Sequence, residues 1–203
     1  GRGAARSGGV RALPGPGSRV WVALAAPRAV QSGAWDCPVG LFDVRVWHIA
    51  RPVPERAVLQ RATDAIRVSQ RPLIVAGGGV AYSEATQALR EFVEATGVPV
   101  AETQAGKGSL AWDDPLSVGA VGATGTTAAN TLAAEADLVI GIGTRWSDFT
   151  TASMSAFADP DVRFVNINVA DLDGLTLSAL SVVAVALEAP PGLPPQAPGL
   201  STS

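Results

Sequence analysis

The sequence predicts an α/β fold in which a parallel sheet lies between layers of helices. Its strongest signal is the run RPLIVAGGG at 71–79, where β-branched and other apolar residues end abruptly in three glycines. Strands buried on both faces of a parallel sheet have this continuous apolar character. Further strand-like runs follow at 98–103, 137–145 and 162–170, separated by helical segments or long loops. Function is therefore to be sought at the carboxyl ends of these strands.

Three helices are expected around this sheet. The first begins at Pro54 and leads into the strand at 71–79. The second starts with Ser83 as N-cap and ends at Gly97, and the third covers 126–136. The apolar spacing predicts the residues that face the sheet: Val58, Ala62, Ala65 and Ile66 in the first helix, Ala85, Ala88, Leu89, Phe92, Val93 and Thr96 in the second, and Ala128, Ala129, Leu132, Ala133 and Ala136 in the third.

The two ends of the chain differ in composition from the middle. Residues 1–19 are mostly Gly, Arg, Ala and Pro, which predicts a flexible amino-terminal segment. Residues 20–53 are expected to hold an edge strand at Val20–Leu24 followed by a linker. The globular domain is predicted over 54–188, and the Pro-rich stretch 189–203 is predicted to be a disordered tail.

Composition excludes several classes of protein. With 203 residues, of which 47% are hydrophobic, the chain can bury one core, and its net charge of −3 gives no argument for nucleic acid as a partner. The apolar run at 175–187 is shorter than the roughly 20 residues that a membrane span needs. Cys37 and His48 are the only residues of their types, which excludes an intrachain disulfide and a Cys/His zinc site. A cytoplasmic location is expected.

A dinucleotide site is only weakly indicated by the glycines. Gly77, Gly78 and Gly79 follow a strand, but Tyr82 stands where the third glycine of GxGxxG belongs. Glu102 lies only approximately where an acid that binds ribose would fall. The chain contains no GxxxxGK[ST], HExxH or GxSxG motif, so no catalytic residue or metal ligand emerges from the motif search.

The loop GATGTTAAN at 122–130 precedes the third helix. Its small and hydroxyl residues surround a helix start at Thr126, where free N–H groups and the helix dipole favour an anion. A plain capped helix explains the same residues equally well. Both interpretations stay open at this point.

Two cations and two asparagines lie near predicted strand ends. Lys107 and Arg145 are placed where open α/β sheets bind ligands, and either is able to meet a phosphate. The favoured alternative is that Lys107 is solvated and that Arg145 pairs with Asp148 or with a neighbouring subunit. Asn166 and Asn168, in VNINV, either bind a ligand or satisfy backbone groups.

Several longer stretches carry a family resemblance. RPLIVAGGGVAYSEA, PVAETQAGKGSLAWDDPL, GAVGATGTTAANTLAAEADLVIGIGTRWSDFTTAS and VRFVNINV together resemble the central domain of thiamine-diphosphate-dependent enzymes. Within that superfamily they are most similar to the trihydroxycyclohexanedione hydrolases of inositol breakdown. The resemblance covers about residues 18–180. It implies a three-layer α/β/α Rossmann-like domain whose mostly parallel sheet has about six strands.

The resemblance also implies what this chain lacks. In the full-length family, thiamine diphosphate and Mg²⁺ lie between an amino-terminal domain and a carboxyl-terminal domain that carries a GDG motif. Here the only Asp-Gly is Asp173-Gly174, preceded by Leu172, so this chain alone is not expected to bind that cofactor or metal. The expected partners are the missing domains of the same enzyme and, in the full-length family, further copies of the enzyme. The isolated chain is expected to expose apolar patches and to self-associate.

Two functions are therefore weighed, neither with a catalytic residue in this chain. The first is a non-catalytic scaffold domain of a carbon–carbon hydrolase, and the alternative is a free-standing FAD- or NAD-binding domain. Related acetolactate synthases hold FAD on the equivalent loops, but in the inositol enzymes a flavin is not expected. A bulky residue at Gly125 is expected to abolish any binding and to leave the fold largely intact. The candidate nucleotide residues, expected to be vestigial, are Gly77, Gly78, Gly79, Thr124, Gly125, Thr126, Gly143, Thr144, Arg145 and Asn168.

Overall fold

The computed structural model describes residues 36, 39–43, 51–175 and 177–186. The chain divides into two compact units, Gly1–Ala50 and Arg51–Ser203. In the described part of the first unit, Val39–Phe42 form the 3-10 helix η1. The predicted flexible segment 1–19, the predicted edge strand Val20–Leu24 and the predicted tail 189–203 lie outside the described residues.

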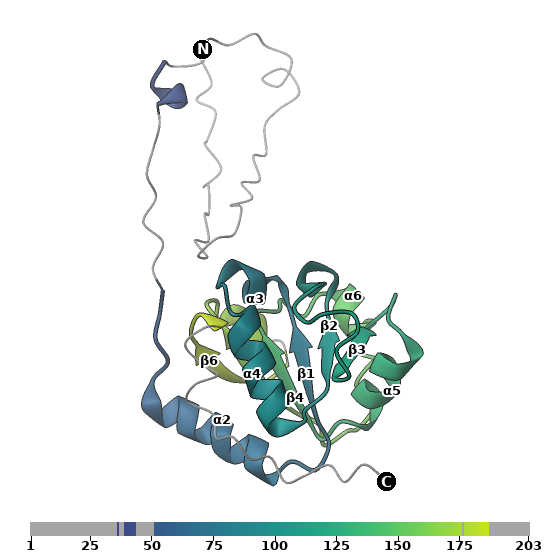
Figure 1. The fold of residues 1–203 in the computed structure, drawn as a ribbon. Helices are drawn as coiled ribbons and strands as arrows, with labels where there is room; N and C mark the ends of the chain where they lie inside the picture. Colours follow the sequence, from purple (N-terminus) through teal and green to yellow (C-terminus); the bar gives the residue numbers. More distant parts are fainter. Residues whose placement is uncertain (1–35, 37–38, 44–50, 176, 187–203) are drawn as a thin grey trace, which may run out of the picture. The chain divides into compact units, whose positions relative to one another are not determined.

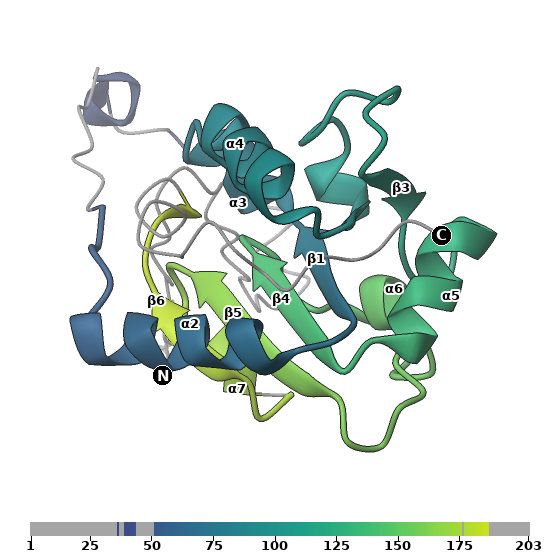
Figure 2. The same ribbon diagram turned by 60° about the horizontal axis from the view of Figure 1, so that its bottom comes forward.

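The second unit is built on a sheet of six strands, all parallel, as the predicted fold class requires (Figure 1). Helices cover both of its faces, which makes the three-layer α/β/α fold (Figure 2). The strand order is β3-β2-β1-β4-β5-β6. The strands are β1 Pro72–Ala76, β2 Val100–Glu102, β3 Ser117–Ala120, β4 Leu138–Ile142, β5 Arg163–Asn168 and β6 Leu180–Val183.

Strand β1 lies in the middle of the sheet and is buried on both faces. Leu73 and Val75 pack into one apolar cluster, whereas Ile74 and Ala76 pack into the cluster on the opposite face. Successive side chains of a strand point to opposite faces, so a strand with helices on both sides needs apolar residues at every position. This explains why the run at 71–79 shows no polar alternation.

The two helical layers differ in how they pack. Helices α2 (Arg56–Val68) and α4 (Thr86–Thr96) contribute Ala62, Ile66, Leu89 and Val93 to one cluster. The other face is covered by α5 (Thr127–Glu135) and by three aromatic rings from outside the helices. Trp146, Phe157 and Phe164 meet edge to face, with centroids 5.2–6.0 Å apart. Edge-to-face packing suits the charge distribution of aromatic rings.

The second predicted helix begins later than expected. Gly78–Tyr82 form a separate short helix, α3, and Ser83 caps its carboxyl end instead of starting the next helix. Glu84 then adopts a left-handed backbone conformation with φ 58°, which interrupts the helical path before α4 starts at Thr86. The end of α4 at Gly97 is as predicted, because its φ of 71° is a conformation that glycine adopts without strain.

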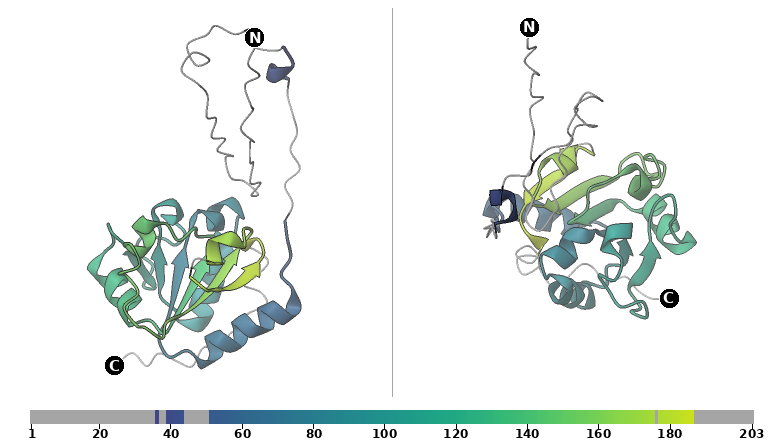
Figure 3. Two further views of the ribbon diagram at one scale, coloured as in Figure 1. Left: turned by 180° about the vertical axis from the view of Figure 1, so that it is seen from behind. Right: turned by 90° about the horizontal axis from the view of Figure 1, so that it is seen from above.

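Two strands were not predicted from the sequence. Strand β3 consists of small residues, SVGA, and β6 lies inside the apolar run at 175–187. They occupy the two edges of the sheet (Figure 3), and their sequences carry weak pattern signals. The helical turns η2 (Gln104–Gly106), α6 (Asp148–Thr151) and α7 (Leu172–Leu175) were also not predicted. Ala128, predicted to face the sheet, is exposed.

Candidate functional site

The predicted nucleotide residues lie at the carboxyl edge of the sheet, around its topological switch point. The chain leaves β1 toward β2 on one side and later returns to β4 on the other side. Open α/β sheets bind ligands in the crevice at such a point. The loops that follow β1 and β4, at 77–79 and 143–145, therefore lie next to each other, as predicted.

These two loops are in backbone contact. The N–H of Gly79 donates to the carbonyl of Gly143 at 3.0 Å, and the N–H of Gly77 donates to Ile142 O at 2.8 Å. A Cβ on Gly77 would lie 2.2 Å from Gly143 O, and one on Gly79 would lie 2.5 Å from Gly143 Cα. The glycines are thus needed for the close packing of α3 on the loop after β4. Gly77 and the two glycines after it form the start of α3, which packs on this loop.

In the third predicted loop, 122–126, backbone N–H groups also form hydrogen bonds to carbonyls of the protein. Gly125 N–H donates to Gly122 O at 2.9 Å, and Thr126 N–H donates to Ala120 O at 2.8 Å. The hydroxyl of Thr126 accepts from Ala129 N–H at 3.1 Å and so caps α5. The structure thus shows the cap, whereas an anion at this helix start stays a prediction.

Asn130 secures the same loop from within α5. Its Oδ1 accepts from the N–H of Gly122 at 2.9 Å and its Nδ2 donates to the carbonyl of Gly122 at 3.0 Å. A Cβ on Gly125 would lie 2.7 Å from Ala120 O and 2.8 Å from Asn130 Oδ1. The expectation that a bulky residue at Gly125 leaves the fold intact is therefore wrong, because the side chain would collide with groups that hold the loop. Thr124, within this loop, is exposed.

Asn168 links the loop after β4 to α7. Its Nδ2 donates to Thr144 O at 2.9 Å and to the Asp173 carboxylate at 3.0 Å. Burial raises the pKa of Asp173, while the positive charge of Arg145 and the hydrogen bond from Asn168 act in the opposite direction. Asn168 therefore satisfies backbone and carboxylate groups, which is one of the two roles that the sequence left open.

The two predicted cations are exposed. No ion pair joins Arg145 to Asp148 among the described residues, and the charge of Arg145 acts on Asp173 instead. Lys107 lies on the loop after β2, whose backbone is held by the buried carboxylate of Glu102. That carboxylate accepts from the N–H groups of Gly108 and Leu110, at 3.0 and 3.2 Å. Glu102 thus binds the backbone of the loop after β2, and not the ribose that its position in the sequence suggested.

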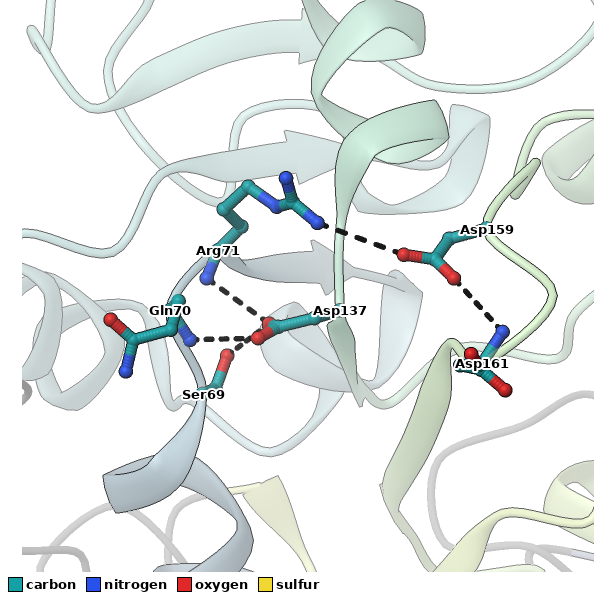
Figure 4. Close-up of polar contacts among 6 residues, drawn as sticks. All are labelled: Ser69, Gln70, Arg71, Asp137, Asp159 and Asp161. Atoms are coloured by element: carbon teal, nitrogen blue, oxygen red, sulfur yellow. Dashed lines mark hydrogen bonds and ion pairs between the residues drawn. The ribbon is translucent and has the colours of Figure 1, made fainter.

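A polar cluster that the sequence analysis missed lies at the opposite, amino edge of the sheet (Figure 4). The carboxylate of Asp137, just before β4, accepts from the N–H of Gln70 at 2.8 Å, from the N–H of Arg71 at 3.1 Å and from the Ser69 hydroxyl. In turn, Asp137 N–H donates to Arg71 O at 3.3 Å. These bonds join the entrance of β1 to that of β4. In the sequence, the only indication of this cluster is the polar triplet SQR at 69–71, between a helix and a strand.

The hydrogen bonds determine the ionisation of this cluster. Partial burial acts to raise the pKa of Asp137, but the bonds from Gln70, Ser69 and Arg71, with the charge of Arg163, outweigh it and hold the pKa below its usual value. The guanidinium of Arg71 extends to Asp159 at 3.7 Å. This cluster stabilises the fold and shows no geometry for catalysis.

Neither a metal centre nor a membrane span is found in the described ranges. No group of three or more His, Cys, Asp or Glu side chains there is arranged to hold a metal ion. No helix in 51–175 or 177–186 has the length and apolar character to cross a bilayer.

Comparison with known proteins identifies the family. The thiamine pyrophosphate enzyme, central domain family matches residues 59–187, more than half of the chain. Two 3D-(3,5/4)-trihydroxycyclohexane-1,2-dione hydrolases of Bacillus cereus are 45% and 46% identical over 180 residues, and one of Bacillus anthracis is 44% identical. The match covers 89% of this chain but only 28% of each relative. The chain belongs to the family of thiamine pyrophosphate enzyme central domains.

Proposed function

We propose that this chain is the central, non-catalytic domain of a trihydroxycyclohexanedione hydrolase of myo-inositol degradation. In the full-length enzyme it would hold in place the domains that cleave a ring carbon–carbon bond. The observation that carries this proposal is the 45% identity to such hydrolases across 89% of the chain, over only 28% of their length. The amino- and carboxyl-terminal domains of such an enzyme are then its partners, in a cytoplasmic homo-oligomer.

Backbone donors at the carboxyl edge that are already bonded within the protein argue against a thiamine diphosphate site in the described residues. Diphosphate needs converging N–H groups, but those of Gly79, Gly125 and Thr126 donate to carbonyls of the protein. Other domains must therefore supply the cofactor site.

The same hydrogen bonds argue against a free-standing FAD or NAD domain. A nucleotide across the strand ends would need the backbone of 77–79, 122–126 and 143–145 to face it. Gly77 and Gly79 instead pack against Gly143, and Thr126 caps α5. The exposed Arg145 remains as a cation at this edge, but one exposed cation does not make a phosphate site. We infer that the nucleotide site is vestigial.

A domain exchange tests the scaffold proposal. The central domain of the Bacillus cereus hydrolase would be replaced by residues 54–188 of this chain. We expect the chimera to bind thiamine diphosphate with Mg²⁺ and to retain ring-opening activity, because a scaffold needs only the right surface and spacing. The control replaces the same domain by a flexible Gly/Ser linker, which should abolish both. A folded chimera without cofactor binding would contradict the proposal.

A further inference from the structure

The side chain of Trp112, in the loop between β2 and β3, is almost fully exposed to solvent. At 91% exposure it is the most exposed of the large apolar side chains in the described ranges. An indole left in water forgoes one of the largest gains from burial that any side chain offers. Single exposed apolar residues are common on protein surfaces, so exposure alone does not indicate an interface. What matters in addition is how firmly the backbone holds the indole in this position.

The backbone around Trp112 is anchored on both sides. The turn at 111–114 is closed by a hydrogen bond from the N–H of its last residue to the carbonyl of its first, at 3.1 Å. Just before the turn, Leu110 is buried in the core, and just after it, Leu116 packs against the same apolar cluster. The N–H of Leu116 also donates to the Asp114 carboxylate at 2.9 Å. A side chain presented on such a preformed turn loses little conformational freedom when it binds a partner.

Two carboxylates stand beside the indole. Asp113 is exposed and Asp114 is half-buried, and neither forms an ion pair with another described residue. Arg90 in α4 lies within their influence: its pKa is raised chiefly by Glu94, and further by Asp114 and Asp113. The guanidinium of Arg90 is already bonded to Glu94, however, at 2.9 Å. The surface around Trp112 therefore suits a partner that brings a positive charge.

The length of the relatives indicates which kind of partner this is. The match covers only 28% of each relative, so most of the length of such a hydrolase lies outside this domain. The turn that carries Trp112 leads into β3, which is an edge strand, and no further strand of this sheet stands beyond it. The turn is thus placed at the border of the sheet, where another domain can reach it.

We propose that Trp112 anchors an interface between this domain and another domain of the same full-length hydrolase. The partner surface offers an apolar pocket for the indole, and an arginine or lysine that faces Asp113 and Asp114. Tryptophan is among the residues that contribute most to binding at interfaces, and a cation is attracted both by carboxylates and by the face of an indole. This inference rests on the proposed function and deepens it, since it names the surface through which the scaffold acts.

Chemical labelling of Trp112 tests its burial directly. Hydroxyl-radical oxidation, read by mass spectrometry, would compare the full chain by itself with the chimera in which residues 54–188 replace the central domain of the Bacillus cereus hydrolase. We expect rapid oxidation of Trp112 in the full chain and a rate lower by roughly tenfold or more in the chimera, because anchor residues are fully desolvated. Trp146, which is buried in this domain, is the internal reference and should react slowly in both proteins.

The same substitution in both proteins measures what the contact contributes. In the full chain, Trp112→Ala should shift the midpoint of thermal unfolding by less than about 2 °C, because an exposed side chain has few contacts to lose. In the chimera it should lower the midpoint by about 4 °C or more. Asp113→Lys should lower the midpoint of the chimera by less, and the effect should weaken as the salt concentration rises.

The outcomes separate this inference from the proposed function. A chimera that binds thiamine diphosphate but leaves Trp112 as reactive as in the full chain would overturn the inference alone. A chimera that folds but binds no cofactor would contradict the proposed function, and the inference would fall with it. Protection of Trp112 that develops in the full chain by itself as its concentration is raised would assign the surface to a second copy, and would also overturn the proposal.

Discussion

The two edges of the sheet are held together by different means. At the amino edge, the carboxylate of Asp137 collects hydrogen bonds from the Ser69, Gln70 and Arg71 segment. At the carboxyl edge, backbone lies directly on backbone, because Gly77 and Gly79 allow α3 to contact Gly143. A single charge can be titrated or replaced, whereas a backbone contact tolerates no added atom. The carboxyl edge, which resembles a ligand site, is therefore the edge whose contacts leave less room for an added atom.

The largest expected effect comes from adding one carbon at the carboxyl edge. In Gly143→Ala the new Cβ would lie 2.5 Å from Gly79 Cα, at a residue whose φ is 62°. Backbone strain and overlap together should lower the free energy of unfolding by about 3 kcal/mol or more. Chemical denaturation would measure this loss.

Gly97→Ala provides the matched control for that variant. Gly97 has a similar φ of 71° but no atom within 4 Å of the Cβ position. Only the conformational cost of about 1–2 kcal/mol should remain. Equal losses in the two variants would mean that the backbone contact between Gly79 and Gly143 contributes nothing.

At the amino edge we expect a smaller loss. Asp137→Asn keeps one acceptor oxygen but removes the charge that strengthens three hydrogen bonds. The free energy of unfolding should fall by about 1.5–3 kcal/mol, a range typical of hydrogen bonds to charged groups. Asp159→Asn, which removes the partially exposed ion pair with Arg71 but keeps an oxygen that can accept from Asp161 N–H, should cost less than about 1 kcal/mol. Similar losses in both variants would contradict a special role for Asp137.

The same carboxylate predicts a pH dependence. The folded-state pKa of Asp137 lies below its usual value, so its contribution to stability is fully present above the unfolded pKa of about 3.9. The contribution is lost as the pH falls through the lower, folded-state pKa. The stability difference between the wild type and Asp137→Asn should be constant from about pH 7 to pH 5 and shrink below about pH 4. Urea titrations across this range test it, and a difference that grows as the pH falls would have the wrong sign.

The smallest effect on stability is expected for an exposed apolar residue at the carboxyl edge. Phe149 in α6 is 59% exposed, while its carbonyl accepts from Ala123 N–H at 2.8 Å. Phe149→Ser should change the free energy of unfolding by less than about 0.5 kcal/mol but reduce self-association and the binding of hydrophobic dyes. Light scattering and dye fluorescence would show this. Wild-type protein that is monodisperse and binds no dye would contradict the prediction, because there would be no self-association for the substitution to reduce.

Sequence reasoning was accurate where a residue's neighbours along the chain determine its structure. The run at 72–76 had to be a buried strand, since no polar residue interrupts it. Gly97 was correctly predicted to end a helix, because a glycine directly after an apolar helical stripe is a common helix end. The edge strand β3 was missed because SVGA has neither apolar alternation nor bulk, and its pairing with β2 depends on contacts distant in sequence.

The candidate site shows the limit of sequence reasoning more clearly. The chain order correctly placed Gly77, Gly125 and Gly143 in loops at one edge of the sheet. A glycine near a strand end permits close approach, but it does not say whether a ligand or another loop approaches. Here the neighbours are Gly143 O for Gly77 and Ala120 O for Gly125. Only the three-dimensional structure could distinguish these possibilities.

The carboxyl edge of this domain packs against its own backbone, and we expect it to bind no cofactor by itself. Isothermal titration calorimetry of the full chain with thiamine diphosphate and Mg²⁺, and separately with FAD, measures this. We predict no saturable heat with either ligand up to millimolar concentration. Saturable binding of FAD that is lost in an Arg145→Ala variant, or saturable binding of thiamine diphosphate, would contradict it.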